Sequence, residues 1–316
     1  MRYAPMDKQH PPLVAIVGPT AVGKTEVAVR LALALNGEII SADSRQVYRH
    51  MDIGTAKPSP QERQQVPHHL IDILNPDEEL TLADYQQRAC AAIDEVHARG
   101  KLPLLVGGTG QYVRAVIEGW SVPHVPPQPA LRADLETFAD VYGATVLHTR
   151  LAAVDPIAAA SIDQRNVRRV VRALEVYLVS GVPISALQTR RPPPYRILQI
   201  GLTRPRSSLY ARIDTRVDRM IAEGLVEEIR RLLEAGYGWG LSAMHSLGYA
   251  QFRGYLQGTM TLEEAARAVK RETRRFVRQQ YTWFRLDDAA IRWFDLDSIP
   301  FEEILTFVRC WLDTLP

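Results

Sequence analysis

Short apolar runs alternate with helical stretches in the first third of the chain. Residues 13–18 (LVAIVG), 37–43 (GEIISAD) and 102–108 (LPLLVGG) are the clearest of these runs. Short runs rich in Val, Ile and Leu are typical of strands that are buried on both faces of a parallel sheet. Their alternation with helices predicts an α/β fold whose core is a doubly wound parallel sheet.

Two proline clusters interrupt this pattern, at residues 121–130 (SVPHVPPQPA) and 190–196 (RRPPPYR). Between them, residues 131–188 have helical periodicity and no apolar run of comparable strength. The prolines predict stiff, nonhelical joints on both sides of a helical insertion. We therefore predict a flexible N-terminal tail at 1–12, a core of residues 13–122 and 196–316, and a helical insertion domain at 123–195.

The chain after the second proline cluster is predicted to contain one more core strand and then mostly helices. Residues 196–202 (RILQIGL) are the predicted strand. Thr261 and Glu264 form a capping-box pattern, which marks the start of a long helix.

Composition and charge narrow the class of protein. The chain has 316 residues, 46% of them hydrophobic and 23% charged, with a net charge of +2 and two cysteines. The cysteines are too few for a disulfide framework, and no apolar run suits a signal peptide or a membrane span. We expect a cytoplasmic monomer with no membrane partner. Any affinity for nucleic acid must come from local basic patches.

Residues 18–25 (GPTAVGKT) carry the pattern of a phosphate-binding loop, between a predicted strand and a predicted helix. The loop amides and the helix N-terminus suit phosphate oxygens, Lys24 adds a positive charge, and the Thr25 hydroxyl can hold Mg²⁺. ATP is the usual ligand of such a loop. However, the run at 102–108 ends in glycines, where a typical NTPase has a magnesium-binding aspartate.

Asp43 ends the second predicted strand and should face the phosphate loop, because ligands of doubly wound sheets bind at the carboxyl ends of strands. A carboxylate in that place is a candidate general base. Helix capping by Asp43 or Ser44, and magnesium binding by Asp43, are equally open from the residues alone.

Two groups of basic residues fall at helical spacing. Each group alone is typical of a solvated helix face, but two groups beside a phosphate site favour an RNA-binding channel. The first is Arg165, Arg168, Arg169 and Arg172 in the insertion, and the second is Arg267, Lys270, Arg271, Arg274 and Arg278 after the Thr261 cap.

Seven segments, in their order and spacing, resemble the bacterial tRNA dimethylallyltransferase family. The resemblance covers nearly the whole chain, and its most specific part is the block at residues 41–58. The segments are GPTAVGKT, SADSRQVYRHMDIGTAKP (41–58), PHHLIDILNP (67–76), LLVGGTGQY (104–112), RALEVYLVSGVPIS (172–185), LGYAQ (247–251) and TWFR (282–285).

The resemblance implies a P-loop NTPase-like core and transfer of a dimethylallyl group from dimethylallyl diphosphate to N6 of the tRNA adenosine 3′ of the anticodon. It implies Mg²⁺ as the cofactor and the anticodon stem-loop as the RNA partner. Asp43 matches the family's proposed base, and Thr20 matches a loop threonine near the reacting amine. The implied diphosphate site consists of Gly18, Pro19, Thr20, Ala21, Val22, Gly23, Lys24, Thr25 and Arg216.

The resemblance also implies a set of tRNA contacts. Departures from the residues usual in the family occur at His50, Gln111, His245 and Ala250. The implied contacts are Asp43, Ser44, Arg45, Gln46, Gln111, Arg132, Arg168, Arg169, Val170, Val171, Arg172, His245, Ser246, Leu247, Gly248, Tyr249 and Ala250.

Three other activities would use the same loop. A small-molecule or nucleotide kinase offers no reason for two basic groups. An RNA-binding ATP switch should need the missing aspartate after the strand, and an enzyme that prenylates free adenosine phosphates should not need the insertion.

Overall fold

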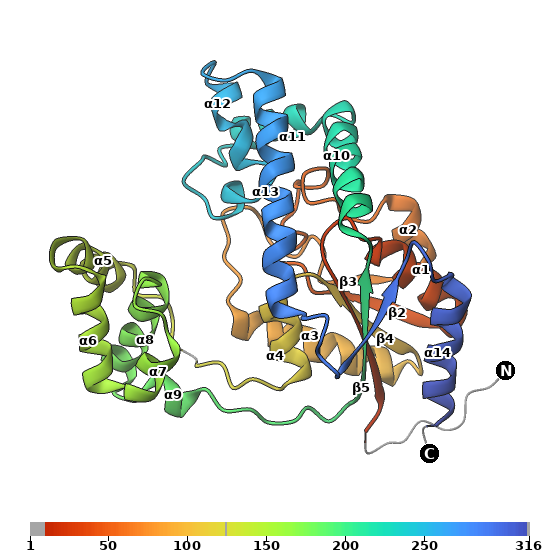
Figure 1. Cartoon of the computed structure of the whole chain (residues 1–316), viewed down its shortest axis with the longest axis horizontal. Coiled ribbons are helices and arrows are strands. Elements are labelled where there is room, and N and C mark those ends of the chain that lie inside the picture. The colour runs from red at the N-terminus through yellow and green to blue at the C-terminus, as the bar shows by residue number, and fades with distance from the viewer. Residues whose placement is uncertain (1–9, 124, 315–316) are drawn as a thin grey trace. The chain divides into compact units, whose positions relative to one another are not determined.

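The computed structural model describes residues 10–123 and 125–314 and divides into two compact units. The larger unit combines Met1–Ile117 with Pro194–Pro316, and the smaller unit is Glu118–Pro193. Figure 1 shows a sheet at the centre of the larger unit and helices in the smaller one. Most of the predicted tail, residues 1–12, lies outside the described residues, and Pro12 already belongs to the first strand.

All strands of the larger unit run parallel in one six-stranded sheet, in the order β3-β2-β4-β1-β5-β6. This confirms the predicted fold class. The central strand β1 is buried along its whole length, as expected for a strand covered on both faces. The strands are β1 (Pro12–Val17), β2 (Gly37–Ser41), β3 (His68–His69), β4 (Leu102–Gly107), β5 (Arg196–Thr203) and β6 (Ile291–Asp295).

Helices cover both faces of the sheet. Val14 and Ile16 of β1 pack in an apolar cluster with α1 and α14, whereas Ala15 and Val17 pack in a second cluster with α3 and α4. Figure 1 shows these two pairs of helices on opposite sides of the strands. The helices of this unit are α1 (Lys24–Leu35), α2 (Pro60–Gln65), α3 (Leu82–Ala98), α4 (Gly110–Ile117), α10 (Arg206–Ala222), α11 (Leu225–Glu234), α12 (Arg253–Leu256), α13 (Leu262–Trp283) and α14 (Phe301–Asp313), with 3-10 turns η1 (Ala243–His245) and η2 (Ala250–Phe252).

The two edge strands, β3 and β6, are absent from the sequence-based prediction. β3 has only two residues, and β6 alternates buried Ile291 with exposed Arg292. Edge strands lack the continuous apolar run by which fully buried strands are predicted. The strand predicted at 37–43 ends at Ser41, so Asp43 lies in the turn that follows β2.

The smaller unit has its own apolar core, which is built from helices. Its described residues also form one isolated bridge, between Trp120 and Arg190, where the chain enters and leaves the unit. The helices are α5 (Pro129–Tyr142), α6 (Ala144–Val154), α7 (Pro156–Ser161), α8 (Val167–Ser180) and α9 (Ile184–Leu187). Across the described ranges of both units, no helix is long and apolar enough to cross a membrane.

A buried carboxylate attaches the edge strand β3 to the sheet. Glu38 of β2 is 2% exposed and lies 2.7 Å from His69 Nε2, 2.7 Å from Arg99 Nη2 and 2.9 Å from Lys101 Nζ. Burial alone would raise the pKa of Glu38, but the hydrogen bonds from Arg99, Lys101 and His69 lower it to about 2. The ionised form is therefore the one that stabilises the fold.

We expect Glu38→Gln to lower the free energy of unfolding by about 3 kcal/mol at neutral pH, since each pKa unit corresponds to about 1.4 kcal/mol. Because the folded pKa lies below the unfolded value, this contribution is present above pH ~4.5 and is lost as the pH falls towards ~2. Urea unfolding of wild type and Glu38→Gln at several pH values measures this difference in the free energy of unfolding. Glu95→Gln, on the exposed face of α3, is the control. A difference between wild type and Glu38→Gln that stays constant down to pH ~2.5 would contradict this assignment.

Candidate active site

The phosphate loop, residues 18–23, and the first turn of α1 border a cavity of about 1560 Å³. Asp43, which follows β2, and Arg216 from α10 line the same cavity. The structure therefore brings together the phosphate loop, the candidate base and the arginine that were predicted from separate segments. Of the predicted site residues, those on the cavity wall are Thr20, Ala21, Gly23, Lys24, Thr25, Asp43, Gln46 and Arg216.

Two glycines give the phosphate loop its shape. A Cβ on Gly18 would lie 2.4 Å from Leu202 O, and Gly23 has φ +114°, a conformation that side chains disfavour. α1 begins directly after Gly23, and no side chain in the described structure caps its N-terminus. The first amides of α1 are therefore available to an anion, and the helix dipole favours negative charge there.

Lys24 is folded back on the phosphate loop. Its ammonium donates to Gly18 O at 3.0 Å and to Pro19 O at 2.8 Å. Burial lowers the pKa of Lys24 to about 8, while Asp43 acts to raise the pKa and Arg216 to lower it further. A bound phosphate would place negative charge beside this partly buried ammonium and stabilise its protonated form.

Arg216 reaches the phosphate loop from α10. Its Nη1 lies 3.5 Å from Thr20 Oγ1. Burial lowers the pKa of Arg216 to about 10, with Asp43 acting in the opposite direction, so the guanidinium is still charged at neutral pH. Two partly buried cations, Lys24 and Arg216, thus face one carboxylate, Asp43, so this side of the cavity is suited to an anion.

Three residues that sequence reasoning missed hold the phosphate loop from outside. Gln280 of α13 accepts from Thr20 N at 2.8 Å. Arg212 Nε donates to Ala21 O at 3.0 Å, and Arg204 Nε donates to Val22 O at 2.8 Å. Arg212 lies one helical turn before Arg216, and this spacing is a signal in the sequence. Nothing local marks Gln280 or Arg204.

Asp43 occupies the turn after β2, where its Oδ1 accepts from Arg45 N at 2.8 Å. The chain from Ala42 to Ser59, all of it described, contains no helix, so helix capping by Asp43 or Ser44, one of the open alternatives, is ruled out. The charge of Asp43 acts on both Lys24 and Arg216. A second recess of about 40 Å³ is lined by Lys24, Thr25, Ser41 and Asp43 among others. General base and magnesium ligand thus remain as roles for Asp43.

The glycines that end β4 make close packing possible. A Cβ on Gly107 would lie 2.1 Å from Ala42 O, and a Cβ on Gly108 would lie 2.2 Å from Gln280 Nε2. Gln280 Nε2 also donates to Gly108 O at 3.1 Å. An aspartate at the end of β4 would therefore collide with the segment that carries Asp43.

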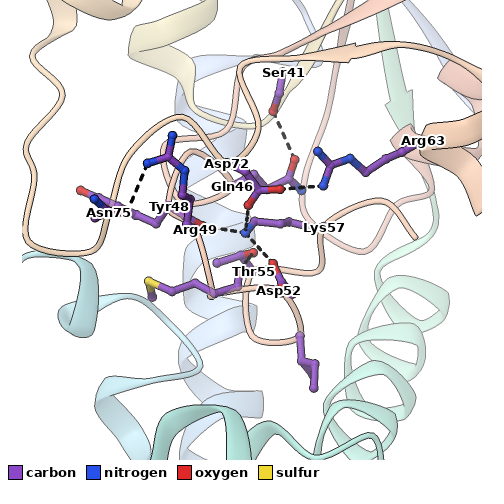
Figure 2. A network of polar contacts seen from close by, with 12 residues as sticks. Ser41, Gln46, Tyr48, Arg49, Asp52, Thr55, Lys57, Arg63, Asp72 and Asn75 are labelled. Atoms are coloured by element: carbon purple, nitrogen blue, oxygen red, sulfur yellow. Dashed lines mark hydrogen bonds and ion pairs between the residues drawn. The ribbon is translucent and has the colours of Figure 1, made fainter. Parts of the chain in front are cut away.

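Figure 2 shows a network of polar contacts whose members Asp52, Lys57, Arg63 and Asp72 line another part of the cavity. Lys57, whose side chain is 3% exposed, lies 2.6 Å from Asp52 Oδ1 and 2.5 Å from Asp72 Oδ1, and it donates to Tyr48 O at 2.6 Å. Arg63 also pairs with Asp72, at 2.6 Å. The charges of Lys57 and Arg63 are balanced by those of Asp52 and Asp72. This wall therefore attracts an anion less strongly than the side of the cavity that carries Lys24.

Several predicted tRNA contacts in the larger unit have other partners. Gln46 donates to Ala56 O and accepts from Ser41 Oγ, each at 3.2 Å. Ser246 and Tyr249 are buried, at 1% and 0% exposure. Their side chains are therefore not available to RNA in this structure. Gly248 is also buried and Ser44, Arg45, Leu247 and Ala250 are partly buried, whereas Gln111 and His245 are exposed.

In the smaller unit, the predicted RNA contacts divide into buried and exposed groups. Val170 and Val171 belong to the apolar core, at 0% and 2% exposure, so their side chains are not offered to RNA. Arg132 and Arg172 bind buried Glu175 at 2.8 and 2.6 Å. Of the first basic group, Arg165, Arg168 and Arg169 are exposed.

The second basic group, on α13, is partly neutralised by α10. Lys270 Nζ lies 2.6 Å from Asp218 Oδ1, and Arg274 Nη2 lies 2.6 Å from Asp214 Oδ1. These pairs join two helices of the larger unit. Lys270 and Arg274 are therefore partly neutralised within the protein, and the exposed members of this group are Arg267, Arg271 and Arg278.

Comparisons with known proteins agree on one family. A family model described as IPP transferase matches residues 46–287. A tRNA dimethylallyltransferase of Chloroflexus aggregans is 61% identical over 273 residues, which cover 86% of this chain and 92% of the relative. One from a Roseiflexus species is 55% identical over 303 residues, which cover 96% and 99%.

Solved structures agree as well. The tRNA isopentenylpyrophosphate transferase of Bacillus halodurans is 46% identical, with a TM-score of 0.71, and the match covers 96% of this chain and 97% of that one. A eukaryotic dimethylallyltransferase described as acting on tRNA is 26% identical, with a TM-score of 0.82 and coverage of 96% and 80%. On the strength of the matched family model and of relatives that align over almost their entire length, this chain belongs to the IPP transferase family.

Proposed function

We propose that the protein transfers a dimethylallyl group from dimethylallyl diphosphate to tRNA, at N6 of the adenosine 3′-adjacent to the anticodon. The observation that carries the proposal is one cavity in which Lys24 and Arg216 face Asp43 beside a phosphate loop. The names of the relatives, tRNA dimethylallyltransferase, support the donor and the acceptor. The reaction belongs in the cytoplasm, where its tRNA substrate is found.

The phosphate loop serves the leaving group. The allylic C–O bond breaks and both bonding electrons leave with the diphosphate, so negative charge develops on the bridging oxygen. Lys24, Arg216 and the free amides at the start of α1 are preorganised around that charge. In this reaction no phosphoryl group is transferred, although the loop has the pattern of ATP-binding proteins.

Asp43 accepts the proton in the proposed mechanism. The exocyclic amine of adenine is a poor nucleophile because its lone pair is delocalised into the ring. As the N6–C bond forms, the departing N6 proton passes to the Asp43 carboxylate, which acts as a general base. The Thr20 hydroxyl, which lies 3.5 Å from Arg216 Nη1, is the group proposed to orient the amine.

Mg²⁺ is the proposed cofactor, held by Thr25 and the donor's phosphates, with Asp43 beside them on the wall of the small recess. The described residues contain no cluster of three or more His, Cys, Asp or Glu side chains that would hold a metal alone. This donor set suits Mg²⁺, which commonly binds substrate phosphates and keeps several waters. When bound, the ion would neutralise charge on the leaving diphosphate.

The anticodon stem-loop is the proposed RNA partner. The target adenine must leave its stack to reach a pocket, as in other enzymes that modify a base. Arg168, Arg169, Gln111 and His245 are the predicted contacts that are exposed in this structure. Arg132 and Arg172 are proposed to support the RNA surface through Glu175, because their guanidinium groups already bind its carboxylate.

An assay with unmodified tRNA, dimethylallyl diphosphate and Mg²⁺ tests the function. Mass spectrometry of the digested nucleosides should find dimethylallyladenosine, and tRNA in which the target adenosine is replaced by guanosine should remain unmodified. ATP hydrolysis without any prenylated nucleoside would instead indicate a kinase or an ATP switch and would refute the proposal.

The pH dependence of the reaction should report the state of Lys24. Because burial lowers the pKa of Lys24 to about 8, the ammonium loses its charge above that pH in the free enzyme. We expect kcat/KM for dimethylallyl diphosphate to fall as the pH rises through about 8. In Lys24→Arg, which stays protonated, this fall should disappear, whereas an unchanged profile would assign it to another group.

A further inference from the structure

The loop at residues 51–58 forms a wall of the cavity that also holds the phosphate loop. Ile53, Ala56 and Lys57 all line this cavity. The wall has no regular secondary structure, and Ala56 has a left-handed φ of 48°. A segment of this kind keeps its shape only if contacts from elsewhere fix it.

Glu228 supplies these contacts from α11. Its carboxylate is buried, at 2% exposure, and accepts hydrogen bonds from three successive backbone amides. Asp52 N and Ile53 N lie 2.9 and 2.8 Å from Oε2, and Gly54 N lies 3.1 Å from Oε1. Successive amides that converge on one anion form a nest, and here the anion belongs to the protein itself.

Tyr249 completes this arrangement. Its hydroxyl donates to Glu228 Oε1 at 2.6 Å. Burial, together with the charge of Glu228, raises the pKa of Tyr249 well above its ordinary value, so the hydroxyl stays a donor. A Cβ on Gly54 would lie 2.4 Å from the ring of Tyr249, so only glycine permits this contact.

Contacts between Asp52 and Lys57 connect the turn at residues 52–54 to the polar network of Figure 2. Lys57 N donates to Asp52 O at 3.1 Å, and Lys57 Nζ contacts the Asp52 carboxylate. A shift of Asp52 would therefore move Lys57 and disturb its pair with Asp72. Such a disturbance would leave a buried ammonium without a full set of acceptors, which is costly.

We infer that Glu228 and Tyr249 are positioning residues for the cavity that is proposed to bind dimethylallyl diphosphate. Together they fix the turn at residues 52–54 and, through Asp52, the position of Lys57 on the cavity wall. The inference rests on the proposed function. It also gives the segment around Tyr249 a role other than RNA contact: it holds the wall from behind. Glu228 touches no substrate in this role and acts through the backbone of residues 52–54.

Kinetics of two variants test the inference. Tyr249→Phe removes one hydroxyl from a buried site, and Glu228→Gln removes the charge at nearly constant shape. A lost hydrogen bond to a buried charge corresponds to roughly a tenfold to hundredfold change. We expect KM for dimethylallyl diphosphate to rise about tenfold in Tyr249→Phe and more in Glu228→Gln, with KM for tRNA within about twofold of wild type. Glu227→Gln, the exposed neighbour on α11, is the matched control.

Hydrogen exchange gives a readout that needs no activity. If Glu228 positions the wall, amides of residues 52–54 should exchange faster in both variants, while those of α11 keep their wild-type protection. Unchanged exchange at 52–54, or a loss of protection throughout α11, would overturn the inference. If wild type transfers no dimethylallyl group but the variants alter exchange only at 52–54, the proposed function fails and the positioning of the wall stands.

Discussion

Asp43→Asn is expected to lower kcat about 10²- to 10⁴-fold, the usual contribution of a general base, and to leave tRNA affinity within about twofold. Asparagine keeps an oxygen that can accept from Arg45 N, so the turn after β2 should persist. What it loses is the capacity to take the N6 proton. Single-turnover rates with bound tRNA, together with filter binding of the tRNA, separate the two effects.

The matched control for Asp43 is Glu26→Gln, because Glu26 lines the same cavity and has no assigned role. Its kcat should change by less than about threefold if the chemistry depends on Asp43 and not on the cavity's total charge. Near-normal turnover in Asp43→Asn would remove Asp43 from proton transfer. A loss restored by higher Mg²⁺ concentration would indicate a metal ligand instead.

Arg216→Ala is expected to lower kcat/KM for dimethylallyl diphosphate about 10²- to 10³-fold, the typical cost of removing one preorganised group from a developing anion. The guanidinium is partly buried beside Thr20 and remains charged at neutral pH, so a cation from solvent cannot easily replace it. Initial rates over a range of donor concentrations measure the loss.

Two variants on α10 check the cause of this effect. Arg216→Lys keeps the charge but not the planar fork, so it should recover only part of the activity. Arg219→Ala removes an exposed arginine that lines the same cavity and pairs with Glu223, and it should cost less than about tenfold. Equal losses in Arg216→Ala and Arg219→Ala would mean that only the total positive charge matters.

Much of the site could be predicted because its residues belong to short segments with recognisable local patterns. The phosphate loop needs only residues 18–25, and Asp43 follows a run that is recognisably a buried strand. The carboxyl ends of parallel strands meet at one edge of the sheet, so their convergence follows from the fold class. The role of Arg216 was predicted only from the resemblance to a family, since an arginine on a helix is more often solvated.

The partners of several predicted RNA-binding residues could not be predicted from the sequence, for a physical reason. Helical spacing tells which side chains share a face, but it does not tell what packs against that face. Arg132 of α5 binds Glu175 of α8, and the carboxylates of α10 bind Lys270 and Arg274 of α13. These partners are decided by helix packing.

By itself, the sequence determined the parallel sheet, the phosphate loop and the place of Asp43 after a strand, because each depends on the periodicity or chemistry of neighbouring residues. Only the tertiary structure decided that Gln280 fixes the loop at Thr20 and that Glu228 gathers the amides of residues 52–54. These contacts join segments that are far apart in the chain. Their energy comes from groups that become buried together, and no local pattern of residues carries that information.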